Sequence, residues 1–326
     1  MTASLSDSFQ NILCGYTPLV NRKISTSGKL IQIREKFKEN HDVFANRRVT
    51  VFCAGSIGRK DSGKKSDLDL FVVANEKVNQ LDTYNFFANL IKINSELKYD
   101  KFSNDGEFLK VYQLDDLTKL TGTREEDSQN VFTARMLLLL ESAPACNESL
   151  YYEFLQCVIN HYCRDEKSHD SSFKPLFLLN DILRYWRTLC LNYEKIRHDT
   201  SKPWRKKNVN LKFSRMLTVY GTVLPLIAGR EHSHEEIIEF CKLSPLERLS
   251  KGLDALNAPE LEPDFLKFLE NYEYFLNLKE EEQIQDDLES EKKRILDEKA
   301  AEFSAFLYAA CTHPNIPLEY RRYLVI

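Results

Sequence analysis

The sequence predicts an α+β protein in which an N-terminal mixed sheet with helices is followed by a long all-helical region. Up to about residue 115, short apolar runs of strand length alternate with amphipathic helical patterns, which is typical of a mixed α/β layer. Beyond about residue 116 the apolar residues recur at helical spacing, and no strand-like alternation is found. We therefore expect one domain at residues 1–118 and a helical domain at residues 119–326.

Each element of the first domain rests on its own apolar pattern. Helical spacing of apolar residues predicts the helices, and uninterrupted apolar runs predict buried strands. In chain order we expect a helix at 27–46, strands at 48–54 and 67–74, a helix at 80–97 and a strand at 108–112. In the second domain we expect helices at 127–142, 147–165, 173–197, 208–228, 233–243, 260–277 and 280–311.

Composition limits the classes of partner and compartment. With 45 basic and 49 acidic residues the net charge is −4, so the whole chain does not match the charge of nucleic acid, whereas a local basic patch would. No apolar run approaches the ~20 residues that a membrane span needs. The first residues lack the basic start and apolar core of a signal peptide, and eight cysteines form no CxxC pair. We expect a cytoplasmic protein with reduced thiols and no membrane contact.

Two aspartates, Asp67 and Asp69, stand at the start of the second apolar run. Side chains two apart on a strand point the same way, so both carboxylates share one face. Two anions held this close repel each other unless a cation lies between them. Mg²⁺ prefers carboxylate oxygens together with substrate phosphates, so the pair predicts a Mg²⁺ site with Asp67 and Asp69 as ligands.

A small-residue turn, Gly55-Ser56, directly follows the first strand. Such a turn lets backbone N–H groups approach phosphate oxygens closely. Arg59 and the pair Lys64-Lys65 add positive charge beside it, and Ser66 directly precedes the acid pair. We expect Gly55, Ser56, Arg59 and Ser66 to bind the phosphates of a nucleotide.

The stretch "GSIGR…KSDLDLF" resembles the DNA polymerase beta-like nucleotidyltransferase superfamily, whose motif is Gly-Ser followed by a strand bearing Asp-x-Asp. The Gly58-Arg59 extension is similar to the branch of the bacterial nitrogen-signalling protein uridylyltransferase, as is "NVFTARMLLLLES". The resemblance implies a Mg²⁺-dependent enzyme that moves an NMP from an NTP to a hydroxyl and releases pyrophosphate.

The resemblance also implies a third catalytic carboxylate on a later strand. Glu107 is the first candidate and Asp105 the second, whereas Asp115 and Asp116 are expected to begin the next helix. A missing third acid would mean slower chemistry, a group supplied by the substrate, or a protein that only binds. In the helix that follows, we expect Arg135 to form a surface salt bridge, with a role in the cleft as the alternative.

A basic tract occupies residues 202–215, which contain no acid. A helix beginning near Asn208 would direct Lys212, Ser214 and Arg215 toward an anion, and Lys212 and Arg215 share a face because they are three apart. The residues expected to bind the triphosphate or a polyanionic acceptor are Lys202, Arg205, Lys212, Ser214 and Arg215. The alternative is a basic solvated surface. On the preceding helix, Trp186 is expected in the core and Tyr185 off the core stripe, where it would stack on a base.

The acceptor stays open at this point. A protein hydroxyl is favoured by the resemblance, an RNA 3′ end by the basic tract, and a small molecule comes third. The alternative function is a catalytically degenerate, nucleotide-binding regulatory module. A structural protein that docks a partner through its charged helix at 279–311 is a third possibility.

Overall fold

The computed structural model describes residues 7–44, 49–100, 102, 106, 109–166, 173–197, 204–228, 232–280 and 290–324. The chain forms two compact units. The sheet unit comprises Asn21–Asp165 and His234–Lys242; the helical unit comprises Met1–Val20, Glu166–Ser233 and Leu243–Ile326. The predicted fold class, a mixed sheet with helices followed by a helix-rich region, is confirmed. A domain boundary between residues 118 and 119 stays a prediction; the compact unit that holds the sheet runs on to Asp165.

The sheet has four strands in the order β3-β2-β1-β4. Strand β1 (Val49–Cys53) is antiparallel to both β2 (Leu70–Ala74) and β4 (Ala143–Cys146), and β2 is parallel to β3 (Val111–Gln113). The helices of this unit are α2 (Thr17–Glu39, whose first residues belong to the helical unit), α3 (His41–Phe44), α4 (Gly55–Gly58), α5 (Gln80–Glu96), α6 (Leu114–Lys119), α7 (Arg124–Ser128), α8 (Val131–Leu140), α9 (Glu148–Tyr162) and α13 (His234–Lys242).

The strand register gives the sheet two distinct ends. Cys53 at the end of β1 lies opposite Leu70 at the start of β2, and opposite Ala143 at the start of β4. Because β3 runs parallel to β2, with Val72 opposite Val111, the residues that follow β3 leave the sheet at the other end. The turn after β1 and the segment before β2 therefore lie together, as the apolar pattern of the two strands requires.

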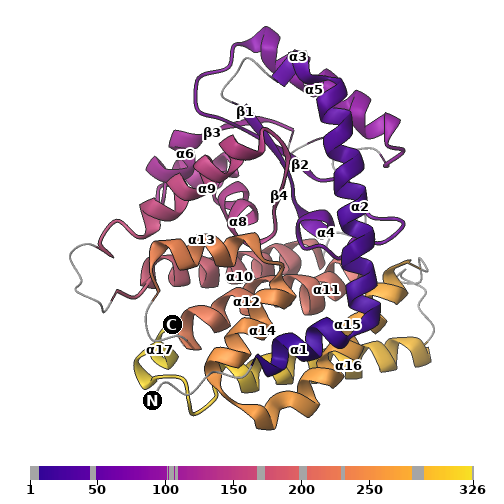
Figure 1. Ribbon diagram of the computed structural model, residues 1–326, viewed down its shortest axis with the longest axis vertical. Helices are drawn as coiled ribbons and strands as arrows, with labels where there is room; N and C mark the ends of the chain where they lie inside the picture. Colours follow the sequence, from indigo (N-terminus) through magenta and orange to yellow (C-terminus); the bar gives the residue numbers. More distant parts are fainter. Residues whose placement is uncertain are drawn as a thin grey trace. The chain divides into compact units, whose positions relative to one another are not determined.

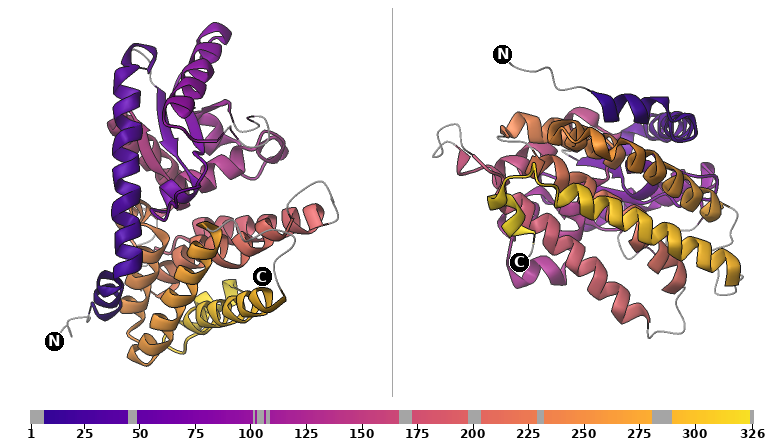
Figure 2. Two further views of the ribbon diagram at one scale, coloured as in Figure 1. Left: turned by 90° about the vertical axis from the view of Figure 1, so that its right-hand side faces the viewer. Right: turned by 90° about the horizontal axis from the view of Figure 1, so that it is seen from below.

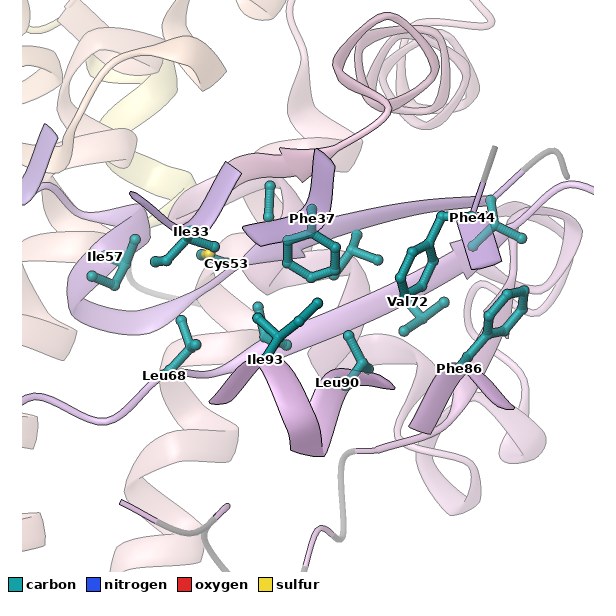
Figure 3. Close-up of a cluster of buried hydrophobic side chains, with 14 of the residues drawn as sticks. Ile33, Phe37, Phe44, Cys53, Ile57, Leu68, Val72, Phe86, Leu90 and Ile93 are labelled. Atoms are coloured by element: carbon teal, nitrogen blue, oxygen red, sulfur yellow. The ribbon is translucent and has the colours of Figure 1, made fainter. Parts of the chain in front are cut away.

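Both faces of the sheet are covered, which is why β1 and β2 read as continuous apolar runs. On one face the strands pack against α2, α3 and α5, and Figure 3 shows Phe37, Val72 and Leu90 inside this core. On the other face Phe52 stacks on Phe71 with ring centroids 5.3 Å apart, and Tyr151 of α9 packs against Phe52. Figure 1 shows α2 and α5 on one side of the strands and α9 on the other.

Several elements differ from the sequence expectation. Strand β2 begins at Leu70 instead of residue 67, so Asp67 and Asp69 precede it. Strand β4 lies in the region expected to be purely helical; its four residues, APAC, are too few to show alternation, and Pro144 is tolerated because β4 is an edge strand. Arg34 of α2 donates a hydrogen bond from Nε to the Pro144 carbonyl at 2.9 Å. Helix α2 begins at Thr17 instead of residue 27. Pro18 in its first turn favours the start of a helix at this point, a signal that does not depend on the spacing of apolar residues.

The helical unit consists of helices only, within the ranges that the structure describes. They are α1 (Ser8–Gly15), α10 (Leu176–Arg197), α11 (Trp204–Asn210), the π-helical turn η3 (Leu211–Arg215), α12 (Met216–Ala228), α14 (Pro245–Leu256), the 3₁₀ turn η4 (Pro259–Leu261), α15 (Glu262–Glu280), α16 (Ser290–Cys311) and α17 (Leu318–Tyr323). Figure 2 shows α15 beside α16.

Helix α14 is an element that the sequence expectation lacks, although Ser244 and Glu247 form a capping box at its start. It packs closely on α12, where a Cβ on Gly252 would lie 2.8 Å from the backbone nitrogen of Pro225. In the described parts of the chain, no helix combines the length and the apolar character needed to cross a membrane.

The core predicts a sharp contrast between two aromatic residues of α5. Phe86 is buried and stacks on Phe44 with ring centroids 5.4 Å apart, so Phe86→Ala should lower the free energy of unfolding by about 3–5 kcal/mol. Tyr84 on the same helix is 59% exposed, so Tyr84→Ala should change it by less than about 0.5 kcal/mol. Urea denaturation of both variants tests this, and equal losses would contradict the packing described here.

Candidate functional site

The turn that follows β1 is shaped by a contact that only glycine permits. Gly55 begins α4 and has a φ of +64°, in the left-handed region. A Cβ built on Gly55 would lie 2.6 Å from Oδ2 of Asp69, closer than real Cβ atoms approach any atom. The Asp69 carboxylate thus lies directly against the Cα of Gly55. This contact joins the small-residue turn to the acid pair, although more than ten residues of chain separate them.

The burial pattern around the two aspartates follows from the core. Leu68 and Leu70 are 2% and 3% exposed and belong to the core that α2 and α5 cover. Figure 3 shows Leu68 in this core, with Ile57 of α4 also packed into it. Asp69 between the two leucines is half-buried, and Asp67 before them is exposed. The alternation leaves the carboxylates outside the apolar cluster, but their binding of a metal stays a prediction.

Cys53, the last residue of β1, lies close to Asp69 but is not a reactive thiol. Burial raises the pKa of the Cys53 thiol to about 12, and the negative charge of Asp69 adds to the rise, against a lowering by Arg34. The side chain is therefore a neutral thiol at physiological pH and serves as a small apolar residue of the core. The candidate catalytic groups at this end of the sheet are therefore the carboxylates of Asp67 and Asp69 and not the thiol of Cys53.

Arg59 directly follows α4, and its guanidinium is held by two carboxylates. Nε lies 3.1 Å from Oδ2 of Asp61, and Nη1 lies 2.7 Å from Oε2 of Glu141. Arg59 is only 6% exposed. Its expected contact with phosphate stays a prediction, but these two nitrogens already have partners. The sequence expectation did not include Glu141. The feature that could have indicated it is a single acidic residue directly after the apolar run of α8.

The loop between the turn and the aspartates is anchored on α2. Lys29 donates from Nζ to Oγ of Ser62 at 3.1 Å and also to the carbonyl of Gly63. The backbone N–H of Ser62 donates to Oγ1 of Thr26 at 3.0 Å. Ser66, expected to bind nucleotide, accepts a hydrogen bond from the N–H of Gly63 at 2.9 Å and so stabilises the turn that leads to Asp67.

The third carboxylate is not identified. Glu107 and Asp105 lie outside the described residues. Asp115 and Asp116 begin α6, as expected, and they follow β3 at the end of the sheet opposite to Asp69. Among the residues that the structure describes, no group of three or more His, Cys, Asp or Glu side chains is placed to hold a metal ion.

The basic tract lies in the helical unit, and Lys202 falls outside the described residues. Lys212, Ser214 and Arg215 belong to the π-helical turn η3 between α11 and α12. Nζ of Lys212 lies 3.0 Å from Oδ1 of Asp297, and buried Ser214 donates to the carbonyl of Asn210. The guanidinium of Arg205 lies over the ring of its neighbour Trp204. Nucleotide binding by Arg205, Lys212, Ser214 and Arg215 stays a prediction.

Two expectations outside the turn are wrong. Arg135 is fully buried, where it pairs with Glu126 and donates from Nε to the Tyr162 hydroxyl at 2.6 Å, so it forms no surface salt bridge. Tyr185 is 2% exposed and Trp186 is half-buried, the reverse of the expected order. Tyr185 belongs to the buried face of α10. Because its side chain is buried inside the helical unit, it cannot stack on a base.

Comparison with known proteins adds one finding. Residues 30–135 match the model of a family described as a nucleotidyltransferase domain. The matched stretch contains β1, α4 and β2, hence Gly55, Asp67 and Asp69. The match supports the polymerase beta-like superfamily, transfer of a nucleotidyl group and an NTP substrate, and such domains generally use divalent metal ions. No curated protein and no solved structure shows significant similarity to the chain.

The contact of Gly55 with Asp69 predicts a coupled effect on stability. Gly55→Ala should lower the free energy of unfolding by about 2 kcal/mol or more, because a positive φ costs Ala about 1–2 kcal/mol and its Cβ displaces the carboxylate. Adding Asp69→Ala should restore part of this loss, since it removes the clash. Gly28 on α2 has open space, so Gly28→Ala is the control and should stabilise by about 0.5–1 kcal/mol. Additive effects of the two site changes would contradict the contact.

Proposed function

We propose that the protein is a Mg²⁺-dependent nucleotidyltransferase that moves an NMP from an NTP to an acceptor hydroxyl and releases pyrophosphate. The contact between Gly55 and Asp69 is the observation that carries the proposal. Asp67 and Asp69 would hold a Mg²⁺ ion that supplies positive charge to the phosphates, so a site of this kind needs a phosphate-binding turn directly beside its acids. The match of residues 30–135 to a nucleotidyltransferase domain supports the same chemistry.

The residues of the turn have the groups that the reaction requires. Asp67 and Asp69 are hard oxygen donors, which suit Mg²⁺; a bound ion would offset the negative charge of the phosphates. The N–H groups of Gly55 and Ser56 stand in the first turn of α4, where intrahelical bonding leaves them unpaired. Because α4 has only four residues, these amides would act as local donors to phosphate oxygens and not through a helix dipole.

In the proposed reaction the acceptor oxygen forms a bond to the α-phosphorus of the NTP. The bond between that phosphorus and the bridging oxygen breaks, and pyrophosphate leaves with the electron pair. The hydroxyl proton passes to a carboxylate, for which Glu107 stays the predicted residue. The contribution of the turn is to orient the triphosphate, which is the main task of an enzyme in phosphoryl transfer.

The acceptor is proposed in the order protein hydroxyl, RNA 3′ end and small molecule. Similarity of the Gly58-Arg59 extension to the uridylyltransferase branch favours a protein. The basic residues from Lys202 to Arg215 favour RNA, whereas the net charge of −4 opposes it. Incubation with each of four labelled NTPs and a cell lysate separates the three, because label enters protein, nucleic acid or small solutes.

The acid pair is tested by the double variant Asp67→Asn with Asp69→Asn. NMP transfer from a labelled NTP should fall by at least about 10³-fold, since both proposed metal ligands lose their charge. The matched control is Asp115→Asn with Asp116→Asn, which removes the same two charges from one exposed and one half-buried aspartate at the opposite end of the sheet. This control should keep transfer within about threefold of the parent.

Persistent transfer in the Asp67/Asp69 variant would overturn the mechanism. Calorimetry with non-hydrolysable NTPs distinguishes the alternative, a regulatory module with degenerate chemistry. Tight Mg²⁺-dependent binding without transfer to any lysate component would favour that module, and absence of both binding and transfer would overturn both functions.

A further inference from the structure

Three charged side chains meet in a nearly closed cluster at the end of the sheet that carries the turn. The side chains of Arg59, Asp61 and Glu141 are 5%, 7% and 0% exposed, and the guanidinium bonds both carboxylates. We call these three residues the ion triad. A buried charge is costly unless it is paired, so each of the two carboxylates is stabilised by the guanidinium between them.

The ion triad connects two segments of the sheet unit that are far apart in the sequence. Arg59 follows α4, Asp61 begins the loop that leads to Asp67, and Glu141 joins α8 to β4. The backbone strengthens the connection, because the N–H of Asp61 donates to the carbonyl of Ser56 at 3.0 Å. The triad thus fixes the residues that follow the Gly55-Ser56 turn.

A second glycine allows the same attachment. A Cβ on Gly58 would lie 2.0 Å from the carbonyl oxygen of Glu141 and 2.9 Å from the Cα of Ser142. Only glycine lets the backbone of α4 approach the start of β4 this closely. Steric contact through Gly58 and charge pairing through Arg59 therefore hold α4 against one and the same residue, Glu141.

We propose that Arg59 is a positioning residue that holds the Gly55-Ser56 turn through Asp61 and Glu141, and that it does not bind phosphate. A guanidinium that moved out to a triphosphate would break its pair with Glu141, a carboxylate with no exposure to solvent, which is unfavourable. In this proposal Gly58 and Arg59 attach the turn to Glu141, whereas Gly55 and Ser56 face the nucleotide. The consequence for nucleotide binding rests on the proposed function; the attachment itself does not.

Amide hydrogen exchange tests the attachment without any nucleotide. Arg59→Gln and Glu141→Gln should each speed exchange in peptides spanning residues 55–66 by about tenfold or more, because the turn loses its anchor. The two changes together should have no more effect than the larger single change, since both break one interaction. Asp61→Asn, at the loop end of the triad, is a milder variant that should shift exchange in the same direction.

The matched control is Glu126→Gln, which breaks the other buried arginine pair of the sheet unit, Glu126 with Arg135. It should cost comparable global stability but leave exchange at residues 55–66 unchanged. Unchanged exchange in Glu141→Gln, or equal acceleration at residues 55–66 in the control, would overturn the positioning role. All variants are compared at a temperature at which circular dichroism shows them folded.

Nucleotide affinity separates positioning from direct contact. If the turn is held through the triad, Arg59→Gln and Glu141→Gln should weaken binding of a non-hydrolysable Mg²⁺·NTP by a similar factor, about tenfold, and Arg59→Lys should recover most of it. A large loss in Arg59→Gln with none in Glu141→Gln would overturn the proposal and make Arg59 a phosphate ligand. If the parent protein binds no NTP, the proposed function fails, and hydrogen exchange alone decides the attachment.

Discussion

The antiparallel pairing of β1 with β2 is the constraint on which the candidate site depends. Cys53 lies opposite Leu70, so the turn after one strand and the acids before the other are neighbours by register and not by chance folding of a loop. A slip of one residue would move every side chain of β2 to the opposite face of the sheet, taking Leu70 out of the core under α2 and α5 and turning Asp69, which directly precedes the strand, toward that core. The burial of Leu68 and Leu70 therefore also sets the direction of the carboxylates. The pairing register of β1 with β2 therefore determines both the apolar core and the position of the carboxylates.

Sequence reasoning reaches the parts of the fold that local pattern encodes. Apolar runs locate β1 and β2, but β2 begins at Leu70, so Asp67 and Asp69 precede the strand that was expected to carry them and their common face stays a prediction. Strand β4 escapes such reasoning because four residues that include a proline have no period, and only pairing with β1 makes them a strand. Glu141 escapes it for a related reason: its partner, Arg59, lies 82 positions away along the chain, and no local pattern reports such a pair. Asp105 and Glu107 lie outside the described residues, so the third carboxylate stays a prediction.

Buried arginines show how charge is misjudged from sequence. The sequence assigns Arg59 and Arg135 to accessible surfaces, since charged residues are rarely fully buried. Each instead has a carboxylate partner with almost no exposure, Glu141 for Arg59 and Glu126 for Arg135. Buried ion pairs contribute little net stability, but the loss of one partner is costly, so they favour one arrangement over all others. A buried ion pair is therefore suited to holding a segment in one fixed position. The turn beside Asp69, which is proposed to bind phosphate, is a segment that needs such a fixed position.

If Arg59 is committed to the ion triad, the positive charge that faces a triphosphate in the sheet unit must come from elsewhere. Lys64 and Lys65 are exposed cations of the loop, and that loop is fixed at its start, by Asp61 in the triad and by Ser62 and Gly63 on Lys29. An exposed lysine attracts phosphate weakly because water screens it, whereas a cation bound by Asp67 and Asp69, as proposed, would act at short range. Affinity for a nucleotide should then depend more steeply on Mg²⁺ than on any single basic residue of this unit. The glycine contact at 55 is consistent with this division, since it places the backbone of the turn directly beside the Asp69 carboxylate.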